Sequence, residues 1–167
     1  MTIKHFGQRV ALLIDVQNLY HSAKHLYGAR VNFKEVLKTA VSQRSLIRAF
    51  AYVVRTKTGE EKPFFEALIK LGIETRVKDL QEYYGGMKKA DWDVGIAVDA
   101  IRISSSIDVI VLASGDGDFL QLVEYLKNQG KRVEVIAFGH SASSRLKEAA
   151  DEFVDIEKNP KKYLLKK

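Results

Sequence analysis

Aspartates occur in three segments that lie far apart in the sequence. Asp15 follows a short apolar run, Asp93 ends an Asp-Trp-Asp triplet, and Asp116 and Asp118 alternate with glycine. Carboxylates that gather in one crevice repel one another, and a hard divalent cation with oxygen ligands relieves that repulsion. If the fold brings these segments together, the sequence predicts a site for a cation such as Mg²⁺.

Each of these acids also has an ordinary structural interpretation. Asp15 and Asp118 can cap the helices that follow them, and Asp93 can stabilise a helix N-terminus through the helix dipole. Asn18 can be an ordinary helix residue. The combination of acids, rather than any one of them, favours the metal site.

The chain alternates apolar runs typical of buried strands with segments typical of helices. This alternation predicts a parallel β-sheet with helices on both faces, in which ligands bind at the carboxyl ends of the strands. The expected strands cover residues 10–16, 46–54, 73–77, 107–113 and 132–138, with a short edge strand over 153–156. The expected helices cover residues 18–27, 33–41, 60–72, 91–104, 118–129 and 143–150, with a loop over 78–89.

The expected elements carry the acids to one edge of the sheet. Asp15 and Asp116 follow strands, and Asp93 opens a helix that begins at the same edge. We therefore expect the three segments to meet in one crevice, where a bound cation would activate water and neutralise the charge of a phosphodiester.

Composition narrows the chemistry further. The 167 residues suit one domain, and the absence of cysteine excludes disulfides, thiolate zinc sites and a cysteine nucleophile. The chain has no Gly-x-Gly-x-x-Gly motif after its first strand and no P-loop lysine motif, which argues against those nucleotide-binding folds. The first residues are mostly polar, and no apolar run approaches the roughly 20 residues that span a bilayer. We therefore expect a cytoplasmic protein with no membrane partner.

The net charge of +6 is concentrated at the carboxyl end. Five of the 27 lysines and arginines lie in residues 158–167, which contain no acid, whereas residues 1–157 are nearly balanced. Such a basic segment can hold a polyanion such as nucleic acid by counterion release, or it can be a solvated end that aids solubility. We divide the chain into a folded domain over 1–157 and a basic C-terminal tail over 158–167.

Three motifs, in the family's order, resemble the NYN domain, specifically its LabA-like (DUF88) branch within the PIN-like superfamily of metal-dependent nucleases. The motifs are Ile14-Asp15-Val16-Gln17-Asn18-Leu19, Lys89-Ala90-Asp91-Trp92-Asp93-Val94-Gly95 and Leu112-Ala113-Ser114-Gly115-Asp116-Gly117-Asp118-Phe119. The resemblance runs from about Arg9 to Ile156. The chain departs from the family at Val16 and Ala90, where glycine is frequent, but neither departure removes a carboxylate.

The resemblance implies a three-layer α/β/α sandwich with a central, mainly parallel sheet. It also implies a ribonuclease that hydrolyses RNA phosphodiester bonds at an acidic pocket with Mg²⁺ or Mn²⁺. The residues that match the pocket motif are Asp15, Asn18, Asp93, Asp116 and Asp118. The four aspartates are the expected metal ligands, and Asn18 is expected to orient a carboxylate, a water or a phosphate.

Other residues carry expectations of their own. Ser114 and Lys89 are expected to contact the substrate, with RNA as the partner, and a homo-oligomer is left open. Asp99 matches a recurrent family position, but it lies about 240° round the helix from Asp93, so we expect a structural role for it. The alternative function is a non-catalytic RNA- or protein-binding regulatory module with the same fold.

Overall fold

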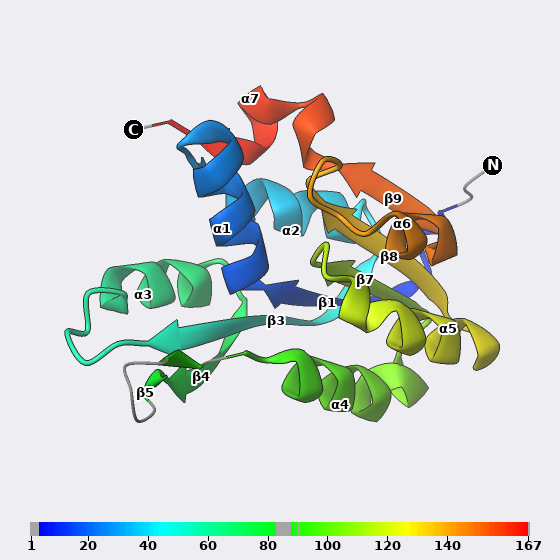
Figure 1. Ribbon diagram of the computed structural model, residues 1–167. Coiled ribbons are helices and arrows are strands. Elements are labelled where there is room, and N and C mark those ends of the chain that lie inside the picture. Colours follow the sequence, from blue (N-terminus) through cyan, green and yellow to red (C-terminus); the bar gives the residue numbers. More distant parts are fainter. Residues whose placement is uncertain (1–3, 83–87, 90, 167) are drawn as a thin grey trace.

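A six-stranded sheet of parallel strands forms the centre of the molecule, in the order β4-β3-β1-β7-β8-β9 (Figure 1). The computed structural model describes residues 4–82, 88–89 and 91–166. The strands are β1 (Arg9–Asp15), β3 (Ser45–Arg55), β4 (Glu74–Asp79), β7 (Val109–Ala113), β8 (Arg132–Ala137) and β9 (Glu152–Asp155). The predicted parallel sheet is confirmed, and the apolar runs around residues 12 and 111 form its two central strands.

Helices cover both faces of the sheet, which confirms the predicted α/β/α layers. One face carries α1 (Val16–Tyr27), α2 (Phe33–Val41) and α3 (Lys62–Lys70). The other face carries α4 (Asp93–Ile103), α5 (Leu120–Asn128) and α6 (Ser144–Ala149). In Figure 1, α1, α2 and α3 lie above the sheet, and α4 and α5 lie below it.

The alternation of side chains along β1 shows how the two cores are divided. Val10, Leu12 and Ile14 pack with the α1 side, whereas Ala11 and Leu13 pack with the α4 side. All five side chains are buried completely, because a central strand has a helix layer on each face. This burial fixes the register of β1 and therefore the position of the residue that ends it.

The segment from 78 to 89 does not form the single loop that the sequence predicted. Strand β4 continues to Asp79, and β5 (Gln81–Glu82) pairs antiparallel with β6 (Lys88–Lys89). Strands of two residues are too short to show a period in the sequence, which is why this hairpin was not predicted. Residues 83–87 lie outside the described residues.

Residues 158–166, predicted from their charge to form a basic tail, contain two short elements. A short helix, α7 (Pro160–Tyr163), leads into β10 (Leu164–Leu165), which pairs antiparallel with β2 (Arg30–Val31). The Tyr163 hydroxyl shares a hydrogen bond of 2.7 Å with the Thr39 hydroxyl, and both Tyr163 and Leu164 are buried. These two apolar residues among the lysines hold the segment against the body, while the lysines remain exposed.

Among the residues that the structure describes, no helix combines the length and the apolar composition that crossing a bilayer requires.

A buried ion pair joins β8 to the segment that follows α2. The Arg44 guanidinium donates to both carboxylate oxygens of Glu134, at 2.8 and 2.9 Å, and also to the Ala40 carbonyl. Arg132 donates to the same Glu134 carboxylate at 2.7 Å. The two partners of the pair are almost completely buried, so each charge depends on the other for its solvation.

We predict that Glu134→Ala lowers the free energy of unfolding by about 3–5 kcal/mol, because it leaves the buried Arg44 charge without a partner. Urea denaturation followed by circular dichroism measures this loss. The double variant Arg44→Met with Glu134→Leu should recover most of it, since no unpaired charge is then buried. A single variant as stable as the wild type would contradict the prediction.

Candidate metal centre

Three carboxylates from distant parts of the chain meet at the carboxyl edge of the sheet. Asp15 is the last residue of β1, Asp93 is the first residue of α4, and Asp116 lies in the turn after β7. One oxygen of each carboxylate lies within 4.8 Å of the others. The predicted convergence of these three segments is therefore present in the structure.

Two hydrogen bonds hold the Asp15 carboxylate in place. The Ser114 hydroxyl donates to its Oδ2 at 3.0 Å, and the Asn18 backbone N–H donates to its Oδ1 at 3.4 Å. The Asp15 residue is only 8% exposed, and Ser114 is completely buried. Asp15 thus caps α1, which is the ordinary structural role of such an aspartate. It is also a member of the group of three carboxylates.

Ser114 connects two members of the group. Its hydroxyl donates to Asp15 and accepts from the Asp116 backbone N–H at 3.2 Å. Ser114 is predicted to contact the substrate, but it has no exposed surface in the structure. Its role here is to position Asp15 relative to Asp116.

Asn18 fixes the turn after β7 from the side of α1. Its side-chain oxygen accepts a hydrogen bond of 2.9 Å from the Gly115 N–H. A Cβ atom at Gly115 would lie 2.9 Å from the Ala142 backbone, so this close approach requires glycine. Asn18 therefore holds the segment that carries Asp116, and its orientation of a carboxylate, a water or a phosphate stays a prediction.

Two further aspartates, Asp91 and Asp118, are close in sequence to members of the group. Asp118 is exposed, and it does not belong to the group of three, although its backbone N–H donates to Asp116 Oδ1 at 2.9 Å. A place for Asp118 as a metal ligand, directly or through water, stays a prediction. Asp91, which the sequence analysis did not select, accepts from the Asp93 N–H at 3.2 Å, and its negative charge acts on both Asp15 and Asp93.

Trp92 explains how the start of α4 is held at this edge. Its indole N–H donates to the Val53 carbonyl at 2.9 Å, and the Lys78 ammonium lies 4.4 Å from the indole ring centroid. A Cβ atom at Gly95 would meet the indole ring, so glycine one turn later lets the ring pack against the helix. This packing fixes the position of the neighbouring Asp93.

Asp99 does not belong to the group of three carboxylates found among the described residues. Asp99 accepts a hydrogen bond of 2.9 Å from the Tyr52 hydroxyl and lies 3.4 Å from Arg76 Nε, which confirms a structural role. The Lys89 backbone belongs to β6, but its side chain lies outside the described residues.

The close approach of the carboxylates changes their titration. Burial, followed by repulsion from Asp116 and Asp15, raises the pKa of Asp93 to about 7. Burial also raises the pKa of Asp15, against the hydrogen bonds from Ser114 and Asn18 that lower it. A bound cation would oppose both effects, and an all-oxygen set of donors suits a hard divalent ion.

Sequence comparison agrees with this architecture. The profile of the NYN domain matches residues 9–157. The chain belongs to the NYN domain family. The match includes the three segments that supply Asp15, Asp93 and Asp116, so the carboxylate group lies within the matched residues.

Individual relatives resemble this NYN domain over most of its length. It is 27% identical to the low amplitude and bright protein LabA of Synechococcus elongatus, over 89% of this chain and 83% of that protein. It is 28% identical to an uncharacterised protein of Methanocaldococcus jannaschii, of which it spans 55%. A crystal structure of a Vibrio parahaemolyticus protein of unknown function superposes with a TM-score of 0.87 at 32% identity, covering 98% of this chain and all of that one.

We predict that Ser114→Ala weakens Mn²⁺ binding by about 10- to 100-fold, the usual effect of removing a hydrogen bond that orients a metal ligand. The variant removes the donor to Asp15 and leaves all three carboxylates in place. Titration calorimetry with Mn²⁺ measures the change. Ser143→Ala serves as a control because its hydroxyl caps α6 instead. Equal affinities for wild type and Ser114→Ala would contradict the assigned role.

The raised pKa of Asp93 predicts a pH dependence of stability in the metal-free protein. An aspartate in the unfolded chain loses its proton near pH 4, whereas Asp93 keeps its proton until about pH 7. Asp93 therefore contributes stability below about pH 4, and this contribution is lost as the pH rises to about 7. Thermal melts in EDTA should show this fall, and it should be smaller in Asp93→Asn. Identical profiles for the two proteins would contradict the shift.

Proposed function

We propose that this NYN domain is a divalent-metal-dependent ribonuclease that hydrolyses RNA phosphodiester bonds. The observation that supports the proposal best is the convergence of Asp15, Asp93 and Asp116 within 4.8 Å at the carboxyl edge of the sheet. A ligand crevice is expected at this edge in parallel α/β folds. The NYN domain also carries the expectation of a PIN-like nuclease fold.

The donor chemistry fits Mg²⁺ or Mn²⁺. The three side chains offer carboxylate oxygens alone, and no histidine among the described residues joins the group. Hard cations prefer such oxygen donors, whereas softer metals prefer nitrogen and sulfur. Asp15, Asp93 and Asp116 would therefore hold the ion.

Hydrolysis adds water across a P–O bond: the water oxygen bonds to phosphorus, and the leaving oxygen takes a proton. A cation held by Asp15, Asp93 and Asp116 would supply a nucleophilic hydroxide and would offset the negative charge that develops on the phosphoryl oxygens. Ser114 and Asn18 hold the carboxylates and the β7 turn in place. We propose that Lys89, which precedes α4 in the sequence, contacts an RNA phosphate, since a lysine can pair with phosphate oxygens.

We predict that Asp116→Asn lowers the rate of RNA cleavage at least 100-fold. Charge stabilisation by a bound metal contributes several kcal/mol to the barrier, and each 1.4 kcal/mol is a factor of ten in rate. Cleavage of labelled single-stranded RNA in Mn²⁺ measures the effect. Asparagine can still accept the Asp118 N–H bond, so the turn should be retained.

Asp118→Asn is the matched control. It also removes one carboxylate charge, but Asp118 lies two residues after Asp116, is exposed, and does not belong to the group of three. We expect it to reduce the rate less than tenfold. Equal losses in the two variants would contradict the assignment of Asp116. Stabilisation of the wild type by Mn²⁺ without cleavage of any RNA would instead favour the non-catalytic binding module.

A further inference from the structure

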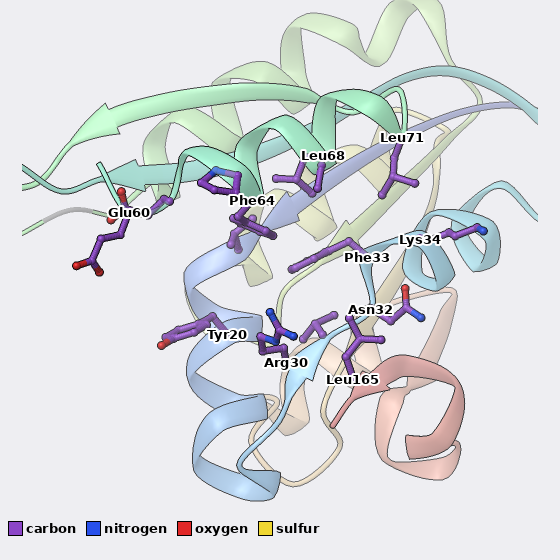
Figure 2. Close-up of a pocket in the computed structure, with 15 residues that line it drawn as sticks. Tyr20, Arg30, Asn32, Phe33, Lys34, Glu60, Phe64, Leu68, Leu71 and Leu165 are labelled. Carbon is purple, nitrogen blue, oxygen red and sulfur yellow. The ribbon is translucent and has the colours of Figure 1, made fainter. Parts of the chain in front are cut away.

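A cavity of about 630 Å³ lies between α1, α3 and the segment that joins β2 to α2 (Figure 2). Val16 and Tyr20 line it from α1, and Phe64 and Leu68 line it from α3. It is separate from the metal centre, because no member of the carboxylate group lines it. Its volume falls within the range of pockets that bind small molecules.

Aromatic side chains form much of the wall of this cavity. The rings of Phe33 and Phe64 lie 5.6 Å apart between centroids, and Tyr20 faces the space from the side of α1. Tyr20 is 45% exposed, with the Lys24 ammonium 5.8 Å from its ring centroid and the His21 ring packed edge-on against it at 5.4 Å. Aromatic faces of this kind stack on flat heterocycles such as nucleobases.

Two polar groups in the lining have no partner among the described residues. Oε2 of Glu61 is buried and accepts no hydrogen bond, although Oε1 of the same carboxylate accepts from Thr56. The side chain of Asn32 occupies the N-cap position of α2 without making a capping bond. A buried acceptor without a donor costs free energy, which a ligand N–H group would recover.

The charged residues of the lining are separated in space. Arg30 and Lys34 come from the β2–α2 side, whereas Glu60 lies near the N-terminus of α3 (Figure 2). Both basic side chains are exposed, and neither forms an ion pair with another described residue. Arg30 lies beside Tyr20 and offers an anchor for an anionic group, whereas Lys34 points away from it (Figure 2).

We propose that this cavity binds a nucleotide, with its base against Tyr20 and Phe64 and its phosphate at Arg30. A fatty acid would match the apolar wall and the basic residues, but it has no N–H group for Glu61. A nucleobase supplies both a flat aromatic face and hydrogen-bonding N–H groups. The cavity therefore combines aromatic rings for stacking, a Glu61 oxygen without a donor and a basic side chain. This combination favours a nucleotide.

The nucleotide has two possible sources with the same chemistry. It is either a free mononucleotide or one residue of a single-stranded RNA that passes the metal centre. Val16 lines the cavity directly after Asp15, so the two sites are consecutive along the chain. Only the second source rests on the proposed ribonuclease function.

Titration calorimetry with adenosine 5′-monophosphate in EDTA tests the site without the metal centre. Ala67 lines the cavity on an exposed face of α3, so Ala67→Trp should fill the cavity without disturbing the core. We expect saturable binding to the wild type and at least about a tenfold loss of affinity in Ala67→Trp. Ile69→Trp, on the same helix and outside the lining, is the matched control and should bind normally.

A second comparison tests the anchor. Arg30→Gln should weaken binding of adenosine 5′-monophosphate more than binding of adenosine, because only the monophosphate carries the phosphate. Absence of saturable binding to the wild type overturns the proposal, as does equal binding to Ala67→Trp and the wild type. Binding of decanoate in place of the nucleotide also overturns it and identifies an acyl-chain site.

A short single-stranded oligoadenylate distinguishes the sources. The oligoadenylate is titrated into the Asp116→Asn variant in EDTA, so that the RNA is not cut during the measurement. Tighter binding than the monophosphate, lost when Ala67→Trp is added, supports an RNA residue as the occupant. Binding of the monophosphate alone supports a free nucleotide, and this result leaves the ribonuclease proposal to the cleavage assay.

Discussion

Electrostatic repulsion among Asp15, Asp93 and Asp116 is the constraint on which the arrangement of this edge depends. Three carboxylates within 4.8 Å would separate if the chain allowed it, since each charge disfavours the ionisation of the others. Asp15 cannot retreat, because it ends a strand whose register is fixed by burial on both faces. Asp116 cannot retreat easily either, because Ser114 and Asn18 hold the turn that carries it.

Both apolar layers of the molecule contribute to holding the charges together. Asp15 continues a strand that is shared by the two cores, whereas Asp93 comes from a helix that packs only on the second one. The centre is therefore closed from one side by α4 and supported from the other by α1. A separation of the carboxylates would have to move a helix layer away from the sheet, at the cost of its buried apolar surface.

The sequence predicts those residues of the metal centre whose position depends only on the order of strands and helices. Asp15 ends an apolar run, and Asp93 opens a helix, so a parallel sheet is enough to bring them to the edge that Asp116 also reaches. The buried role of Ser114 and the exposed position of Asp118 depend on how one turn is shaped, and the residue types in that turn fit either arrangement. Likewise, the packing of residues 158–166 depends on a distant strand pair that carries no local pattern.

The cavity could not be predicted because it depends on the spacing of α1 and α3, which lie apart in the sequence. Helix α1 nevertheless connects it physically to the metal centre. Asn18 and Ser22, one turn apart, face the β7 and β8 turns, where Ser22 meets the Ser141 hydroxyl at 3.0 Å. Val16 and Tyr20, also one turn apart, face the cavity on another side of the same helix. The same helix therefore contacts both the cavity and the turn that carries Asp116.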